Sequence, residues 1–277
     1  MANPLFIEGN VALITGAAMG IGRATAIELA NRGMSVAITD LPGNDLSEVE
    51  QELIKLCGNA DQVLCLPVDL SEADAAAKIQ AAVEQKFSSI NVLMNNAVTR
   101  EARTFEGTTE QWKQLFDVNV WALVDASRRF MPGMLASGKR GAIINVGSKQ
   151  GITNPPGTPA YNMAKAAVKI FTEQLEHELR NNPANNNQVT SHLLVPGWTT
   201  TGKNPHKEGA WLPEQVVSTM INAIDNGSFY IVCPDGEVST DMDNRRIVWG
   251  AEDITNDRPP LSRWHPSFKS DAEKACS

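Results

Sequence analysis

The chain has 277 residues and a mass of 30.0 kDa, enough to bury a full core, and we expect one α/β domain with a C-terminal extension. A net charge of −8 and a pI near 5.1 disfavour binding to nucleic acid or to an anionic membrane surface. The sequence shows neither a basic-then-apolar leader nor an apolar run of roughly 18 residues, so we expect a cytoplasmic protein without membrane contact. The cysteines lack the close spacing of a metal site, which predicts no bound metal and a reducing compartment; they are Cys57, Cys65, Cys233 and Cys276.

A turn rich in glycine, residues 15–22, directly follows the first apolar run, residues 11–14. The order predicts a strand, a tight turn and then a helix. Gly16 can take backbone angles closed to other residues, Gly20 leaves room for a pyrophosphate, and Gly22 lets the helix pack close to the sheet. Because the first N–H groups of a helix are unpaired, this helix start favours an anion such as a dinucleotide pyrophosphate.

The helix and strand after this turn add a second feature of dinucleotide sites. A helix is expected over 20–32 and a strand over 35–39, which ends on Asp40. An acidic residue about twenty positions past the glycines suits the hydroxyl groups of a ribose. The alternative is an ordinary flexible loop between strand and helix, which the acid at the strand end disfavours.

Strands and helices continue to alternate along the chain. We expect further strands at 62–68, 90–94, 142–146, 189–195 and 229–233, and helices at 45–56, 71–87, 108–132, 160–180 and from 213 onward. Capping boxes are expected at residues 45–48 and 108–111. This alternation predicts a doubly wound Rossmann fold with a parallel sheet of about seven strands over residues 1–238.

Polar residues follow the predicted strands at the ends where such sheets bind their ligands. They are Thr15, Asp40, Asp69, Asn95, Ser148 and Pro196. The sequence therefore predicts a single ligand-binding rim.

Tyr161 and Lys165 lie one helical turn apart, so both project from the same helix face. A lysine about 5 Å from the phenol contributes roughly 3 kcal/mol at an effective dielectric of about 20, which lowers the tyrosine pKa. Tyr161 then becomes a workable proton donor or acceptor. The isolated pair is weak evidence, because packing plus a solvated charge gives the same pattern. Ser148, at a neighbouring strand end, strengthens it.

In order and spacing, these motifs resemble the short-chain dehydrogenase/reductase family. The resemblance covers roughly residues 5 to 233 and rests on Thr15-Gly16-x-x-x-Gly20-x-Gly22, Asn95-Asn96-Ala97, Asn119, Ser148, Tyr161-x-x-x-Lys165 and Pro196-Gly197. It implies that Tyr161 is the general acid/base and that Lys165 lowers its pKa and holds the nicotinamide ribose. It also implies that Ser148 orients the substrate oxygen and that Asn119 holds a water in a proton relay.

The resemblance also implies a set of cofactor contacts. They are Gly16, Met19, Gly20, Ile21, Gly22, Asp40, Asp69, Asn96, Tyr161, Lys165, Pro196, Thr199 and Thr201. The charge of Asp40 would repel the extra phosphate of NADP, and positions 17–19 carry no Lys or Arg. Arg23 lies past the last glycine and is a poor substitute, so the expected cofactor is NAD.

Three features depart from the family pattern. Val98 stands where a glycine is usual, which restricts the backbone and adds bulk near the cleft. Gly147 replaces the first of a common serine pair. The usual Asp-Gly-Gly ending after the seventh strand is missing, and the chain continues through an extension, residues 239–277, with a helix expected over 240–251.

The loop 202–212 lies where the family covers its substrate. Trp198 and Trp211 either line an apolar pocket or belong to the core or an interface, and His206 is expected to be a solvated loop residue. The sparse charge of this loop suggests a neutral, partly apolar substrate. We expect the extension, residues 239–277, to pack over the substrate rim or on a neighbouring subunit.

The leading hypothesis is an NAD-dependent oxidoreductase that moves hydride between nicotinamide and a secondary alcohol or its ketone. The alternative is a binding protein that senses NAD or NADH without turnover, which has no need of Ser148, Tyr161 and Lys165. The resemblance favours a homodimer or homotetramer built partly from the helices that carry Asn119 and Tyr161. NAD as cofactor favours the direction of alcohol oxidation.

Overall fold

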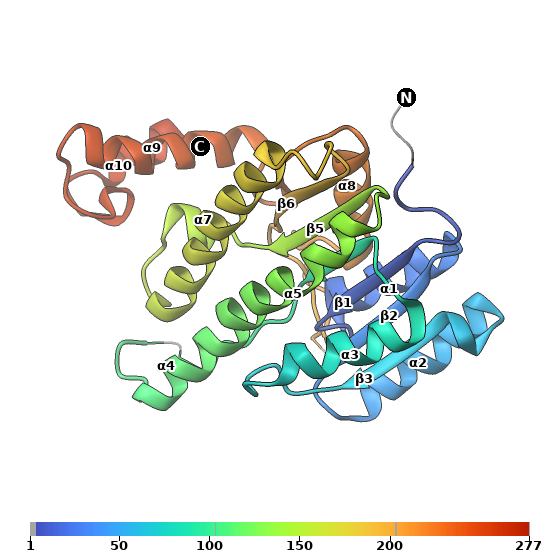
Figure 1. Cartoon of the computed structure of the whole chain (residues 1–277). Helices are drawn as coiled ribbons and strands as arrows, with labels where there is room; N and C mark the ends of the chain where they lie inside the picture. Colours follow the sequence, from blue (N-terminus) through green and yellow to red (C-terminus); the bar gives the residue numbers. More distant parts are fainter. Residues whose placement is uncertain (1–3, 103, 203, 277) are drawn as a thin grey trace.

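The computed structural model describes residues 4–102, 104–202 and 204–276, and it places seven parallel strands in the order β3-β2-β1-β4-β5-β6-β7 (Figure 1). The strands are β1 (Val11–Thr15), β2 (Ser35–Asp40), β3 (Val63–Pro67), β4 (Val92–Asn95), β5 (Gly141–Val146), β6 (Val189–Val195) and β7 (Tyr230–Val232). The predicted fold class is confirmed. Strand order reverses between β1 and β4, so the ligand crevice of such a sheet lies at their carboxyl ends.

Helices cover both faces of the sheet. They are α1 (Gly20–Asn31), α2 (Asn44–Cys57), α3 (Ala75–Phe87), α4 (Thr109–Phe116), α5 (Ala122–Ala136), α6 (Gln150–Thr153), α7 (Pro159–Asn181), α8 (Pro213–Asp225), α9 (Thr240–Thr255) and α10 (Lys269–Cys276). Neighbouring residues of β1 serve separate cores: Ile14 packs with α1, α2 and α8, whereas Leu13 packs with α3, α5 and α7. This alternation is what a strand buried on both faces requires.

Two helix starts differ from the prediction. The capping box expected at residues 45–48 is wrong, since α2 begins at Asn44 after Gly43, which makes no side-chain cap bond. Helix α3 begins at Ala75, several residues later than predicted, because Asp69 instead accepts hydrogen bonds from the main-chain N–H and the hydroxyl of Ser71. Short polar side chains compete with helix formation in this way.

The helix predicted to end near Pro132 continues to Ala136, with the proline inside α5. Phe130 and Met134 on either side of it are buried in the core formed with α3 and α7. Their burial outweighs the one hydrogen bond that a proline removes. The capping box at Thr108 is confirmed: its hydroxyl accepts from the main-chain N–H of Gln111, whose side chain bonds back.

The extension forms a helical unit with a small core of its own. Trp249 of α9 packs with Ala272 and Cys276 of α10 and with Phe268. The indole N–H donates to the hydroxyl of Ser262 at 2.7 Å. Helix α9 is longer than predicted, and α10 was not predicted. Figure 1 shows both helices standing to one side of the sheet, beyond α7.

No helix among residues 4–102, 104–202 and 204–276 is long and apolar enough to cross a membrane. Lys203 in the loop 202–212, Ser277 at the end of the extension, and residues 1–3 and 103 of the predicted domain lie outside the described residues.

Candidate active site

The glycine turn after β1 brings main-chain atoms together so closely that side chains are excluded. Gly16 has a φ of 66°, and a Cβ atom there would lie 2.7 Å from the Cα atom of Ala97. A Cβ atom on Gly22 would lie 2.2 Å from the carbonyl oxygen of Gly16. Both distances are far below van der Waals contact, so only glycine permits this turn.

Thr15 and Asn96 join the ends of β1 and β4. The Thr15 hydroxyl accepts from the main-chain N–H groups of Asn96 and Ala97, at 3.0 and 3.1 Å. In return, the Asn96 amide donates to the carbonyl oxygens of Thr15 and Gly16, at 3.0 and 2.9 Å. Asn96, which was predicted to line the cofactor cleft, therefore holds the main chain of the glycine turn in place.

The start of α1 fits an anion, and the end of β2 fits a ribose. No side chain caps α1 at Met19, and its first turn holds no acidic residue. Asp40 lies beside the turn, where its carboxylate accepts from the main-chain N–H of Ala18 at 2.9 Å. Arg23 pairs with Glu52 at 2.5 Å, so its charge is already partly neutralised. The residues present therefore fit a dinucleotide, with pyrophosphate at the helix start and ribose at Asp40.

Three further residues predicted to contact the cofactor are Thr201, Thr199 and Ile21. Thr201 lies against the glycine turn, since a Cβ atom on Gly20 would be 3.1 Å from the Thr201 methyl group. The hydroxyl of Thr199 donates to the carbonyl oxygen of Gly197 at 3.1 Å. Thr199 also pairs with Trp211 in an isolated β-bridge, which closes the base of the intervening loop. Ile21 is buried in the core, so its side chain contributes packing.

Tyr161 and Lys165 are both buried on α7, with 6% and 3% of their surfaces exposed. The Lys165 ammonium donates to the carbonyl oxygen of Val146 at 2.7 Å and lies 5.8 Å from the centre of the Tyr161 ring. Gly151 allows α6 to pack on this part of α7, because a Cβ atom there would lie 2.4 Å from the main chain of Lys165. The ammonium is thus fixed beside the phenol.

Arg100 is a site residue that the sequence analysis missed. Its guanidinium carbon lies 4.3 Å from the centre of the Tyr161 ring, within the range of a cation–π contact. Burial acts to raise the pKa of Tyr161, but the charges of Lys165 and Arg100 and hydrogen bonds with Ser148 and Arg100 outweigh it. The pKa of Tyr161 is therefore below the ordinary value of 10.0. Burial lowers the pKa of Lys165, and the Tyr161 charge opposes that effect.

Asn119 lies in a π-helical turn, η2 (Asp117–Trp121), between α4 and α5. Its side-chain oxygen accepts from the main-chain N–H of Thr99 at 2.8 Å, and its amide donates to the carbonyl of Thr99 at 2.9 Å. The Asn119 amide group therefore holds the segment after β4. Val98 in that segment is half-exposed and has no positive φ, so the backbone accepts it without the strain expected of a glycine position.

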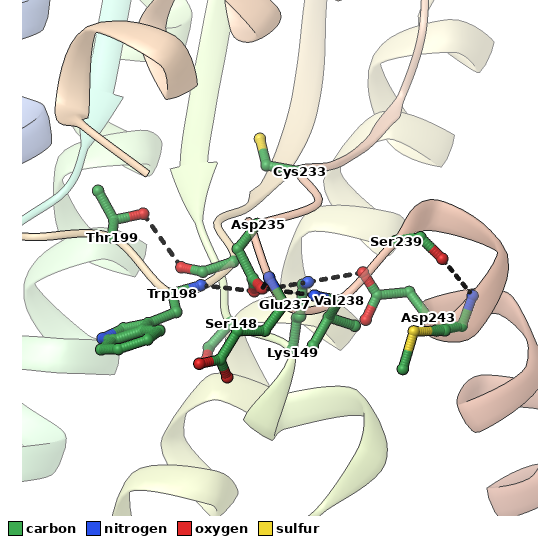
Figure 2. Close-up of polar contacts among 12 residues, drawn as sticks. Ser148, Lys149, Trp198, Thr199, Cys233, Asp235, Glu237, Val238, Ser239 and Asp243 are labelled. Carbon is green, nitrogen blue, oxygen red and sulfur yellow. Dashed lines mark hydrogen bonds and ion pairs between the residues drawn. The ribbon is translucent and has the colours of Figure 1, made fainter. Parts of the chain in front are cut away.

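A buried ion cluster directly follows Ser148 (Figure 2). The Lys149 ammonium lies 3.3 Å from the carboxylate of Asp235 and 2.6 Å from that of Asp243 on α9. None of the three was predicted, because Lys149 is distant from both acids in the sequence and a single lysine carries no pattern. Through Asp243, the extension therefore contacts the residue that follows Ser148.

A second unpredicted network lies beneath the rim. The Asn95 amide donates to the side-chain oxygen of Asn145 and to the hydroxyl of Ser127, at 2.8 and 3.1 Å. The Asn145 amide in turn donates to the hydroxyl of Thr172 at 3.1 Å. All four side chains are buried. They join β4 and β5 to α5 and α7, so the strand ends that carry the site are held in register.

Comparison with known proteins decides the family. The model of the short chain dehydrogenases matches residues 10–209. The chain belongs to this family. It is 32% identical to the 3-oxoacyl-(acyl-carrier-protein) reductase FabG of Thermotoga maritima over 224 residues, which cover 80% of this chain and 85% of that protein. It is 35% identical to the 2,3-dihydroxy-2,3-dihydro-p-cumate dehydrogenase of Pseudomonas putida over 177 residues, 64% of this chain and 67% of that one.

Solved structures of the family have the same fold. A short chain dehydrogenase/reductase of Burkholderia phymatum in complex with NAD superposes with a TM-score of 0.80 at 26% identity, covering 92% of this chain and 97% of that one. The L-sorbose reductase of Gluconobacter frateurii, in complex with NADPH and L-sorbose, gives 0.72 at 25% identity, covering 83% and 97%. Members of the family thus bind either nicotinamide cofactor, and the protein is an oxidoreductase of the class that acts on CH–OH or keto groups.

Proposed function

We propose that the protein is an NAD-dependent dehydrogenase that moves hydride between nicotinamide and a secondary alcohol or its ketone. The observation that carries this proposal is the environment of Tyr161. Its phenol is buried beside Lys165, Arg100 and Ser148, and these three neighbours lower its pKa. A lowered pKa lets the phenol form tyrosinate at lower pH than a free tyrosine, and tyrosinate can accept a proton from an alcohol. The phenol lies on the rim that also carries the glycine turn, as a reaction between the bound cofactor and the substrate requires.

In alcohol oxidation, the substrate hydroxyl would hydrogen-bond to Ser148 and to Tyr161. Tyrosinate accepts the hydroxyl proton while the adjacent C–H bond breaks, and the bound nicotinamide supplies the acceptor for that hydride. The ammonium of Lys165 stabilises the tyrosinate before transfer and would hold the nicotinamide ribose of a bound cofactor. Ketone reduction uses the same groups in reverse, with the Tyr161 hydroxyl donating its proton to the carbonyl oxygen.

The proton accepted by Tyr161 must then reach solvent. The Asn119 side chain is bonded to Thr99 on both its oxygen and its amide. A relay water held by Asn119 would therefore bind its main-chain carbonyl, in a turn where π-helical geometry alters the usual hydrogen bonds. Lys165 connects that water to the phenol.

The choice of NAD is supported by Asp40 and Arg23. The Asp40 carboxylate lies beside the glycine turn, where it accepts from the main-chain N–H of Ala18, and its charge would repel a 2′-phosphate on a ribose bound there. Arg23, the nearest basic residue after the glycines, pairs with Glu52. The contacts proposed for NAD remain those predicted from the sequence, including Asp69 near the adenine and Pro196, Thr199 and Thr201 on the nicotinamide side.

The experiment that tests this function compares the wild type with Tyr161→Phe on a panel of secondary alcohols, sugars and hydroxysteroids. NADH fluorescence should appear with the wild type and fall by at least about 100-fold with the variant, while both bind NAD equally. Equal NAD binding without turnover by either protein would instead support the alternative, a protein that senses NAD or NADH.

We also propose that the protein is a cytoplasmic homodimer or homotetramer, with residues 1–238 as the catalytic domain and 239–277 as the extension. Trp121, Met163 and Ile170 on η2 and α7 are each more than half exposed. Large apolar side chains so exposed are typical of subunit interfaces. Analytical ultracentrifugation decides the state, and a wild-type monomer at micromolar concentration would contradict the proposal.

A further inference from the structure

The loop after β7, residues 234–238, holds both ends of the 198–212 loop. One oxygen of the Asp235 carboxylate accepts from the main-chain N–H of Trp198 at 2.9 Å. At the other end, the N–H of Gly236 donates to the carbonyl of Gly209 at 2.7 Å. The two loops are in direct contact, since a Cβ atom on Gly197 would lie 2.7 Å from the Asp235 carboxylate. A displacement of Asp235 therefore moves the segment expected to cover the substrate.

Lys149 joins this loop to the catalytic strand end. It directly follows Ser148, and its ammonium lies 2.6 Å from Asp243 and 3.3 Å from Asp235 (Figure 2). The two carboxylate side chains are only 3% and 4% exposed. Charges this deeply buried keep a fixed geometry, because every movement away from the partner leaves a charge unpaired in a low dielectric.

The two acids differ in what else holds them. Asp235 also accepts from the main-chain N–H groups of Glu237 and Val238, so its place is set by its own loop. Asp243 belongs to α9, and the positive charges facing it are Lys149, Arg246 and Arg263, with Asp235 as the negative neighbour. The closer partner of Lys149 is thus supplied by the C-terminal extension.

We propose that Lys149 is a positioning residue through which Asp243 of the extension fixes Ser148 and the 198–212 loop for catalysis. Lys149 touches neither reacting atoms nor cofactor in this role. Its ammonium aligns the main chain at Ser148 and, through Asp235, holds the loop at Trp198. The kinetic part of this inference rests on the proposed dehydrogenase function.

The decisive variant is Asp243→Asn, which removes one charge of the cluster and keeps the Lys149–Asp235 pair. The matched control is Asp241→Asn on the same helix, where the carboxylate pairs with Arg245 at the surface. Hydrogen–deuterium exchange is measured on full-length protein over residues 147–152 and 198–212. We expect exchange in both segments to be about tenfold faster in Asp243→Asn than in wild type, and unchanged in Asp241→Asn.

Kinetics on an alcohol from the panel give the second readout. We expect kcat/KM for the alcohol to fall about tenfold in Asp243→Asn, because the Ser148 hydroxyl is misplaced relative to the substrate oxygen. The dissociation constant for NAD should stay within about twofold of wild type. Asp243→Glu retains the charge one methylene away, so its exchange rates should lie between those of wild type and Asp243→Asn.

Wild-type exchange rates in both Asp243 variants would overturn the inference, as would equal effects of Asp243→Asn and Asp241→Asn. If Asp243→Asn does not fold, Asp243→Glu against wild type makes the same comparison. If wild type oxidises no alcohol, the proposed function fails, and the exchange measurements still decide whether Lys149 has this positioning role.

Discussion

The guanidinium carbon of Arg100 lies 4.3 Å from the centre of the Tyr161 ring, and the ammonium of Lys165 lies 5.8 Å from it. The proposed acid/base therefore has two cations beside it, of which only Lys165 is buried. Arg100 extends from the segment after β4, and its charge both lowers the pKa of Tyr161 and adds a positive group to the rim. This charge at the rim is at odds with the neutral substrate that the loop sequence suggests.

Arg100→Gln should move the pH dependence of alcohol oxidation to higher pH. Removing the positive charge raises the pKa of Tyr161, so tyrosinate forms at higher pH and kcat/KM at pH 7 falls, by about tenfold. Arg100→Lys, which keeps the charge, should lie close to wild type. A pH profile of Arg100→Gln that superposes on that of wild type would show that Arg100 does not influence the phenol.

Gly22→Ala should weaken NAD binding by at least about tenfold, because its Cβ atom would lie 2.2 Å from the Gly16 carbonyl and displace α1. Gly133→Ala in α5 is the control, since among the described residues no atom outside its chain neighbours and its own helix backbone lies within 4 Å of the Cβ position. The control should bind NAD normally and gain about 0.5–1 kcal/mol in unfolding free energy. Isothermal titration calorimetry and urea denaturation measure the two effects. Normal NAD binding by Gly22→Ala would contradict the role of the turn.

Asp40→Asn should reduce the preference for NAD over NADP. The variant retains hydrogen-bonding groups toward the ribose but loses the charge that repels a 2′-phosphate, so the ratio of kcat/KM values should change about tenfold or more. Steady-state kinetics with both cofactors measure the ratio. A wild type that prefers NADP would refute the cofactor assignment outright.

Substitution of Asp243 and substitution of Asp235 should affect stability to different extents, because their pKa values shift in opposite directions. Burial raises the pKa of Asp243 above its ordinary value of 3.8, so the folded state binds a proton more readily than the unfolded state. Between pH 3.8 and the folded-state pKa, Asp243 is ionised in the unfolded state but still protonated in the folded state, so stability falls as pH rises through this range. Asp243→Asn should therefore leave the unfolding free energy at pH 7 within about 1 kcal/mol of wild type.

For Asp235, burial acts to raise the pKa, but bonds from Trp198, Glu237 and Val238 and the charge of Lys149 outweigh it, so the pKa is lowered. Its contribution to stability is present above the ordinary value of 3.8 and is lost as pH falls toward the folded-state pKa. Asp235→Asn should cost about 2 kcal/mol at pH 7 in urea denaturation. Equal stability of the Asp235 and Asp243 variants would contradict this difference.

The sequence predicted the sheet well because its strands are bounded by strong signals. β6 has the predicted bounds, 189–195, between an Asn-rich linker and Pro196. Helix ends were predicted less well: α5 continues past Pro132 because buried side chains on both sides decide its length. Periodicity describes single elements, and tertiary packing overrides it at their ends.

In the candidate site, too, local sequence patterns predict some residues, and tertiary contacts bring in the others. Tyr161 and Lys165 were predictable because one helix fixes their spacing. Arg100, Asp235 and Asp243 reach the site from segments far from Tyr161 in the sequence, so no local spacing relates them to it. Their roles follow only from the folded chain.

Both ends of the 198–212 loop are held through main-chain atoms, the N–H of Trp198 and the carbonyl of Gly209. Among the described residues between those two points, 199–202 and 204–208, the side-chain hydrogen bonds stay within the loop or reach Gly197, and none reaches the loop 234–238. Mutations in that interval, outside the proposed cofactor contacts Thr199 and Thr201, can therefore change which alcohol fits without breaking these two main-chain attachments. The loop is a segment in which new substrate preferences can evolve at little risk to the fold, and it is the natural place to diversify the protein in a selection for altered specificity.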